Sequence, residues 1–435
     1  MERFIGLFGL IGILGIAYAA SNNKKRINWR LVGMGMLIQV VFGFLVLKGK
    51  EWGAPFNFLA IAFEKIGEGF VAILGYTTAG AQFVFGNLAI SPGANGSLGF
   101  FFVFQVLPTI IFFSSLMSLL YYMGVMQKVV HGMAWVMSKL MGTSGAESLS
   151  CTANIFVGQT EAPLMIRPFI KTLTNSELLT IMVGGMATIA GGVMAAYIQM
   201  LGQSYADTYG VPIEQGQIMF ATQLLGASIM AAPAGLAISK IIFPEVSDPV
   251  TKGSVKVEVE KNASNVIEAA ATGAADGMNL ALNVAGMLLA FIALIALFNS
   301  LFGIVGGWVG IENLTLQDIF GYVFAPVAFL TGVPWSEAQE VGRLLGTKIV
   351  LNEFVAYSDM AGLIHSKAIQ DPKSIMIATF ALCGFANFSS IAIQIGGIAP
   401  LAPERRKDIA ALGLRAVLGG ALATLMAGTI AGILL

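Results

Sequence analysis

The feature that most constrains this chain is a series of almost uncharged apolar runs, several of them about 20 residues long, which is the length a helix needs to cross a bilayer. Charged residues make up only 11% of the chain and hydrophobic residues 56%, whereas soluble domains carry about 25% charged residues. The sequence therefore predicts an all-α polytopic membrane protein, with lipid as its surroundings and no soluble domain. The formal net charge is zero, so nothing points to a nucleic-acid partner.

The apolar runs predict about eight transmembrane helices. The expected spans lie at residues 4–20, 31–47, 98–123, 178–201, 218–243, 266–302, 374–400 and 412–435. Residues 51–85 carry Glu64, Lys65 and Glu68 at helical spacing, which is typical of an interfacial amphipathic helix, here expected on the outer side. Residues 125–141 are too short and too polar to span, so a second interfacial helix is expected on the inner side.

Basic clusters predict the orientation of the spans. Ala17-Tyr18-Ala19 after the first run imitates a secretory cleavage site, but the strongest basic cluster, at 24–30, follows that run and should remain in the cytoplasm. The first run is therefore expected to stay as a span. The basic clusters at 24–30, 167–171, 240–261 and 405–407 then all face the cytoplasm, and both termini lie outside. The expected location is the cell (inner) membrane.

Two polar stretches interrupt the apolar chain. Gln159, Thr160 and Glu161 stand between Gly158 and Pro163, and Asn352 and Glu353 form a second polar pair further along. A carboxylate at membrane depth costs a few kcal/mol, so such a residue indicates a functional site. Irregular backbone is tolerated in a bilayer only where it is buried in protein or lines a cavity. Both stretches are therefore expected to be tips of re-entrant hairpins, at 144–172 and 319–364, each with a buried glutamate.

The two hairpins belong to an internal repeat. A span with glycines and a polar residue at 187–193 follows the first hairpin, and a span interrupted at 383–390 follows the second. The order of hairpin, broken helix and whole helix thus occurs at 144–243 and again at 319–435, and the two copies enter the membrane from opposite sides. An inverted repeat of this kind is typical of secondary transporters, whose substrate and ions bind near the midplane between broken helices.

The polar residues of these stretches indicate the class of ligand. The candidates are Gln159, Thr160, Glu161, Asn352, Glu353, Asn387, Ser389 and Ser390. Neither tip contains arginine or lysine, which disfavours a phosphate or carboxylate substrate. A neutral substrate with many hydroxyl and N–H groups fits better. Phe385 and Phe388 could provide an aromatic face or simply pack, and Cys151 and Cys383 are interpreted as small packing residues, not as a disulfide.

Five motifs resemble the concentrative nucleoside transporter family over nearly the whole chain. They are G-Q-T-E-A-P at 158–163, M-A-T-I-A-G-G-V at 186–193, G-A-A-D-G-M-N-L-A-L-N-V-A-G-M-L at 273–288, N-E-F-V-A-Y at 352–357 and A-L-C-G-F-A-N-F-S-S-I-A-I at 381–393. The resemblance implies a homotrimer that imports nucleosides by alternating access and needs no cofactor. Residues 1–123 and 244–303 would form the scaffold, and residues 124–243 and 304–435 the moving transport domain.

The resemblance also implies the roles of individual residues. Gln159, Thr160, Glu161 and Val193 would meet the nucleobase, and Glu353, Asn387 and Ser390 the ribose, with Phe385 close by. A sodium ion would be held by Asn154, Val157, Thr188 and Ile189. Some relatives have serine where this chain has Thr188, but the hydroxyl is kept, and sodium prefers such hard oxygen ligands. Some bacterial members use protons, so both sodium and proton coupling stay open, as does the choice between purines and pyrimidines.

Two other functions are compatible with polar groups in a membrane. An intramembrane enzyme could use Glu161 and Glu353 as an acid and a base, but the chain lacks an H-E-x-x-H motif and has only two histidines. A passive channel for polar solutes is the other alternative, and an inverted repeat with two buried glutamates favours alternating access over it. Transport by a symporter is therefore the leading expectation, and an enzyme is not expected.

Overall fold

The computed structural model describes residues 2–90, 95–253, 263–308, 310–311 and 314–435. These residues form helices joined by short links, and the only β-type pairing among them is an isolated bridge between Ser144 and Lys252. The expected all-α polytopic membrane fold is confirmed.

Six helical segments of the described chain are long and apolar enough to cross a membrane. They are Trp29–Trp52, Phe102–Tyr122, Asn175–Tyr209, Ile213–Ile242, Val266–Trp308 and Pro403–Leu434. The first consists of α2 (Trp29–Gly43), one π-helical turn and α3 (Gly49–Trp52), and the second of α5 (Phe102–Gln105) and α6 (Leu107–Tyr122). The other two predicted spans correspond to shorter apolar helices, α1 (Glu2–Ala19) and the interrupted pair α16 (Pro372–Leu382) and α17 (Phe388–Ile398).

The first repeat copy starts from two capping boxes. The Ser144 side chain caps α8 (Gly145–Ala153) together with Glu147, and Thr174 caps α9 (Asn175–Ala187) together with Glu177. Each box satisfies two backbone N–H groups that a helix start leaves free. The returning arm of the hairpin, Ala162–Thr172, is a 3-10 helix with Pro168 inside it, because proline has no N–H to donate and breaks a regular α-helix.

The rest of the first copy follows the predicted order. After the break, the chain continues as α10 (Gly191–Tyr209) and α11 (Ile213–Ile242), and α7 (Val125–Met141) precedes the hairpin. The spans expected at 178–201 and 218–243 are too short at this junction, because α10 and α11 leave only residues 210–212 between them.

The second copy contains one helix more than the expected hairpin. Residues 319–364 were expected to form a single hairpin with a break, but they hold α13 (Leu316–Leu330), α14 (Trp335–Val350) and α15 (Glu353–His365). A bend of 116° separates α13 from α14, and the re-entrant pair that presents Glu353 is α14–α15. The last helix, α18 (Arg406–Leu434), begins six residues before the expected start at 412.

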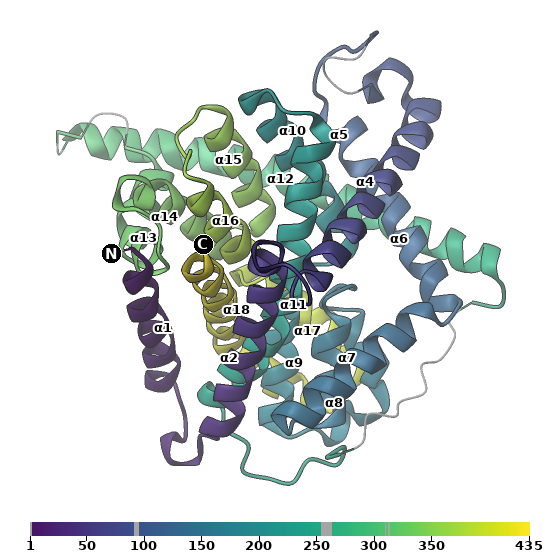
Figure 1. The fold of residues 1–435 in the computed structure, drawn as a ribbon, viewed down its shortest axis with the longest axis vertical. Helices are drawn as coiled ribbons and strands as arrows, with labels where there is room; N and C mark the ends of the chain where they lie inside the picture. The colour runs from purple at the N-terminus through teal and green to yellow at the C-terminus, as the bar shows by residue number, and fades with distance from the viewer. Residues whose placement is uncertain (1, 91–94, 254–262, 309, 312–313) are drawn as a thin grey trace.

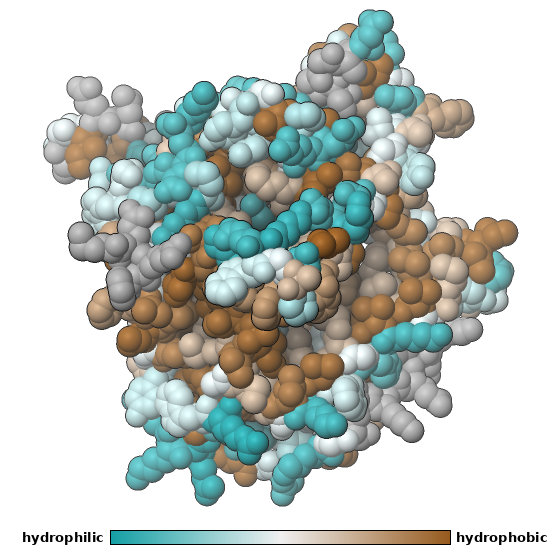
Figure 2. Space-filling model, viewed as in Figure 1, coloured by the Kyte–Doolittle hydropathy of each residue, from teal (hydrophilic) through white to brown (hydrophobic). Residues whose placement is uncertain are grey.

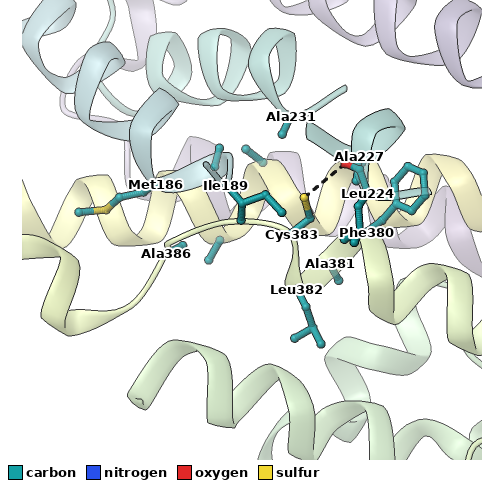
Figure 3. Close-up of a cluster of buried hydrophobic side chains, with 14 of the residues drawn as sticks. Met186, Ile189, Leu224, Ala227, Ala231, Phe380, Ala381, Leu382, Cys383 and Ala386 are labelled. Atoms are coloured by element: carbon teal, nitrogen blue, oxygen red, sulfur yellow. Dashed lines mark hydrogen bonds between the residues drawn. The ribbon is translucent and has the colours of Figure 1, made fainter. Parts of the chain in front are cut away.

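The two copies run in opposite directions through the molecule. In Figure 1, α8 and α9 lie in the lower half and α14, α15 and α16 in the upper half. The chain passes from α9 up to α10, and from α16 down to α17. The two breaks meet in the centre, where a Cβ atom on Gly384 would lie 2.7 Å from the Met186 carbonyl oxygen and 2.9 Å from that of Ala187. Figure 3 shows this crossing, with Met186 and Ile189 beside Cys383 and Ala386.

The long helix α12 (Val266–Trp308) has an exposed apolar face. This face presents a row of large side chains that includes Leu282, Leu289, Ile292, Leu297 and Leu301. In Figure 2, hydrophobic residues cover much of the middle of the molecule and hydrophilic residues gather at its lower edge.

Other sequence-based boundaries differ in detail. The helix α4 (Phe58–Phe85) is preceded by a turn at Gly53, with φ of 69°, so the expected helix at 51–85 starts seven residues later. Lys256 and Lys261, which belong to the basic cluster at 240–261, lie outside the described residues.

Candidate functional site

A cavity of about 150 Å³ lies between the two hairpin tips. Residues of both hairpin tips, the breaks, α10, α12 and α17 line it. They are Gly158, Gln159, Thr160, Glu161, Ala190, Val193, Leu280, Val284, Met287, Leu288, Asn352, Glu353, Phe354, Phe385, Asn387, Ser389, Ser390 and Ile393. All eight residues predicted to contact substrate are among them, so segments more than 200 positions apart in the chain share one chamber.

The Glu353 carboxylate is buried at one wall of this cavity. Its side chain lies on the first turn of α15, where the helix dipole favours a negative charge. The Tyr197 hydroxyl donates to Oε1 at 3.1 Å, and the Asn387 amide donates to Oε2 at 3.1 Å. These two bonds fix the direction of the carboxylate and leave further lone pairs for hydroxyl groups of a ligand.

Two asparagines start the helices that point at the cavity. Asn352 accepts from the backbone N–H of Val355, and Asn387 accepts from that of Ser390, both at 2.9 Å. Each therefore acts as the N-cap of its helix, which explains why polar residues stand at these two breaks. Because the caps are rigid, they also fix the position of Glu353 and Ser390.

Gln159 joins the two repeat copies. It donates to the Ser390 hydroxyl at 3.1 Å, and Gln394 donates to its Oε1 at 3.0 Å. Gln394 is fully buried and also donates to the Met182 carbonyl at 2.9 Å. The first hairpin tip is thus held against α17 and α9 by side-chain amides, which can both donate and accept.

Glu161 is exposed, which corrects the expectation of a buried glutamate in each tip. Glu161 lines the cavity on the side that is open to the surface. The Glu161 carboxylate lies so close to Gly158 that a Cβ there would overlap it. The physical reason is the tight turn at 158–161, which folds the Glu161 side chain back over the glycine toward open space. The two glutamates therefore share a cavity but have different surroundings.

The residues predicted to hold sodium surround the junction between the first hairpin and the first break. Asn154, Thr188 and Ile189 are buried, and Val157 is half-buried. The Phe156 carbonyl accepts from the Gly191 N–H at 3.0 Å, which ties the hairpin to the start of α10.

One side-chain atom at this junction has no partner among the described residues. Asn154 Nδ2 donates to the Ser150 carbonyl at 3.0 Å, but the buried Asn154 Oδ1 accepts no hydrogen bond. The Thr188 hydroxyl donates to the Gly184 carbonyl at 2.9 Å and keeps its lone pairs. An orphaned buried oxygen is costly, and a hard cation would satisfy it. The residues present therefore fit a sodium ion.

Sequence reasoning missed three parts of the site. Tyr197 lies four positions after Val193 on α10, and Gln394 four positions after Ser390 on α17, so each shares a helix face with a predicted residue. That spacing was a usable signal. The wall contributed by α12 includes Leu280, Val284 and Leu288 of the 273–288 motif, but these residues look like ordinary core residues, so the motif alone did not mark them as lining the cavity.

Comparison with known families identifies the chain. Three family models match in succession: "Na+ dependent nucleoside transporter N-terminus" over residues 8–88, "Nucleoside recognition" over 103–204, and "Na+ dependent nucleoside transporter C-terminus" over 223–432. An uncharacterized transporter of Haemophilus influenzae is 46% identical over 439 residues, covering 100% of this chain and 98% of the relative. The chain belongs to the concentrative, sodium-dependent nucleoside transporter family. As a member of a transporter family it is not an enzyme.

Other members of the concentrative nucleoside transporter family are similar over the same length. Human sodium/nucleoside cotransporter 1 is 39% identical over 446 residues, which cover 100% of this chain and 64% of the human protein. The structure of CNTnw in an inward-facing substrate-bound state superimposes with a TM-score of 0.86 at 42% identity, covering 100% of this chain and 98% of that one. The fold is therefore that of this transporter family.

Proposed function

We propose that this protein is a symporter that imports nucleosides into the cell, driven by a sodium gradient. The observation that carries the proposal is the cavity in which the buried Glu353 carboxylate lies among mostly neutral polar groups, with Glu161 at the exposed side and no cationic side chain among the described lining residues. Such a lining suits an uncharged ligand with many hydroxyl and N–H groups. Family membership and a substrate-bound relative of the same fold support the same substrate class.

The sugar and the base have different expected partners in the cavity. Glu353 and Asn387 would accept and donate hydrogen bonds to the ribose hydroxyls, with Ser390 beside them, because diols suit a carboxylate acceptor. Gln159, Thr160 and Glu161 on the first tip would meet the edge of the base, and Val193 and Phe385 would contact its faces. A charge-assisted hydrogen bond contributes roughly 1.5–3 kcal/mol, so Glu353 would contribute most to the affinity.

Sodium would act by completing the first hairpin tip. Asn154, Val157, Thr188 and Ile189 surround the junction described above, and the chain passes directly from Val157 to Gly158 and Gln159 of the cavity. An ion at this junction would satisfy the Asn154 oxygen and hold the tip in the shape that binds nucleoside. Binding of one ligand would then favour the other, and this reciprocal coupling is what a symporter needs.

The proposed transport cycle moves the two hairpins and broken helices, residues 124–243 and 304–435, as one domain. Residues 1–123 and 244–303 would be the fixed scaffold and form a homotrimer, for which the exposed apolar face of α12 is suitable. CNTnw is solved in an inward-facing state, and variants of it are solved in outward-facing and intermediate states, which supports alternating access in this chain. The basic clusters would face the cytoplasm and both termini the outside.

Proton coupling is the second candidate. The buried Glu353 carboxylate, which could carry a proton instead of accepting ligand hydroxyls, favours it. In that case sodium would not be required, and nucleoside uptake would follow the proton gradient.

The deciding experiment uses the purified full chain in proteoliposomes. Uptake of radiolabelled uridine and adenosine is measured while a sodium gradient and a proton gradient are imposed separately. We expect accumulation of nucleoside above its outside concentration only with sodium. Undiminished accumulation in sodium-free buffer would assign the coupling to protons, and uptake that never exceeds equilibrium would contradict a symporter.

A further inference from the structure

Lys348 is a buried cation that forms no salt bridge in the described part of the chain. Only 2% of its surface is exposed, and it forms no salt bridge within 4.0 Å among the described residues. Its ammonium donates to the Ala381 carbonyl at 2.8 Å and to the Thr424 hydroxyl at 2.9 Å. A buried charge is costly unless other groups compensate it; here the two hydrogen-bond acceptors do so directly, and the Glu353 carboxylate attracts the ammonium from beyond salt-bridge distance.

Ala381 belongs to the last turn of α16, the first half of the second broken helix. The last four carbonyls of a helix have no partner within the helix, and here all four find one elsewhere. Cys383 and Gly384 donate their N–H groups to Phe380 and Leu382 at 3.1 and 2.8 Å. The Tyr357 hydroxyl donates to Thr379 at 2.7 Å, and Lys348 supplies the remaining bond. The Lys348 ammonium therefore lies at the negative end of the α16 dipole, where a positive charge is favourable.

The equivalent helix end in the first repeat copy is not satisfied in this way. The half-helix α9 ends at Ala187, and of its last four carbonyls only that of Gly184 has a hydrogen bond among the described residues, from Thr188. The carbonyls of Gly185, Met186 and Ala187 accept no hydrogen bond from the residues described. The hairpin arm beside it ends at Asn154, which presents an orphaned oxygen instead of a cation.

The two helix ends correspond to each other in the repeat. In each copy, the first arm of a hairpin (α8 or α14) ends beside the first half of a broken helix (α9 or α16). In the first copy, the Asn154 oxygen and the last carbonyls of α9 lack hydrogen-bond partners at this place within the described chain. In the second copy, the carbonyls of α16 are paired, and the Lys348 ammonium supplies one of the bonds. We propose that the Lys348 ammonium is a tethered cation that takes, in the second repeat copy, the place that a sodium ion takes in the first.

The proposal has a consequence for coupling and rests on the sodium site of the proposed function. Because Lys348 already fills the second place, only the first copy responds to sodium, and the second hairpin is held to α16 in every state of the cycle. Lys348, on α14, is thus a positioning residue for the hairpin whose other arm, α15, carries Glu353, and it is not among the residues that line the substrate cavity.

The test compares two substitutions of similar effect on charge. Lys348→Asn shortens the side chain and leaves an amide oxygen beside the Ala381 carbonyl and the Thr424 hydroxyl, whereas Lys348→Met removes the charge but fills the space. The unfolding temperature of the purified full-length protein is measured against NaCl concentration, with choline chloride keeping the ionic strength constant. A ligand that binds only the folded state raises this temperature.

We expect both substitutions to lower the unfolding temperature in choline chloride. Sodium should then restore stability in Lys348→Asn beyond the wild-type response, with a Hill coefficient rising from about 1 toward about 2 as a second site opens. Lys348→Met should keep the wild-type sodium response. Identical sodium responses in the two variants would overturn the proposal.

A measurement on the unaltered protein decides the question if the variants do not fold. The ratio of sodium to uridine taken up by proteoliposomes should be about 1, and a ratio of about 2 would overturn the proposal. Failure of the proposed function is recognised separately. Wild-type uptake without sodium would refute sodium coupling, yet a sodium response gained by Lys348→Asn and absent in Lys348→Met would still support the tethered cation.

Discussion

The Gln159 amide donates a hydrogen bond to the Ser390 hydroxyl at 3.1 Å, across 231 positions of the chain. It connects the first hairpin tip to the second half of the second broken helix. A ligand between the tips would therefore be contacted by both repeat copies, and changes at either copy should alter substrate affinity.

Replacing Glu353 by glutamine should reduce nucleoside uptake roughly 10- to 100-fold, because it removes a charge-assisted hydrogen bond of roughly 1.5–3 kcal/mol while keeping the shape. Initial rates of uridine uptake in proteoliposomes measure the effect. Glu214→Gln, at an exposed carboxylate near the start of α11, is the matched control and should transport normally. Wild-type uptake by the Glu353 variant would contradict the proposed ribose contact.

Replacing Asn154 by alanine should weaken sodium activation by about tenfold or more, since it removes the buried oxygen that lacks a partner. The sodium concentration for half-maximal uptake is the quantity to measure. Asn23→Ala changes an exposed asparagine between α1 and α2 and should have no effect. An unchanged sodium dependence in the Asn154 variant would exclude this residue as a ligand.

Replacing Lys240 by methionine should destabilise the protein by about 3–5 kcal/mol, because it leaves a buried carboxylate uncompensated. Lys240 Nζ lies 2.7 Å from Glu147, and both side chains are buried at the base of the first hairpin. Thermal unfolding in detergent measures the loss. Lys252→Met breaks the exposed pair with Asp248 and should cost only about 0–1 kcal/mol. Equal losses in the two variants would show that burial of the pair has no effect.

Replacing Gly384 by alanine should destabilise the protein by about 1–3 kcal/mol, because the added methyl group would press on the Met186 and Ala187 carbonyls. Nucleoside uptake should fall as well, because the added methyl group would push the two helix breaks apart and change the cavity beside them. Gly362→Ala on α15 is the control, because its Cβ would meet nothing within 4 Å. If the Gly384 variant is as stable and active as this control, the close contact between the two helix breaks is not required.

The order of the elements could be predicted from the sequence because lipid imposes strong local rules. Apolar length identifies spans, and polar residues beside glycine or proline mark breaks such as those at Thr188 and Asn387. Helix ends were less predictable, because α10 and α11 continue through polar residues that a water-exposed loop would also contain. The break at Gly332 and Pro334 looked like part of a hairpin, and only the packing of α13 against α14 shows a separate helix.

The composition of the cavity was predictable in part. Polar residues in apolar surroundings are conspicuous, so Gln159, Glu353 and Asn387 were identified directly. The sequence did not show that Glu353 is buried and Glu161 is exposed, because each residue stands in a similar short polar motif. The difference arises from the turn at Gly158 and from donors, such as Tyr197, that only the fold brings near.

At Gly384 the two interruptions lie so close together that an added methyl group would press on the carbonyls of Met186 and Ala187. Any movement of one interruption relative to the other would have to open this close contact. If the two repeat copies move as one domain, as proposed, an ion and a nucleoside bound beside this contact would cross the membrane together and would be released on the same side.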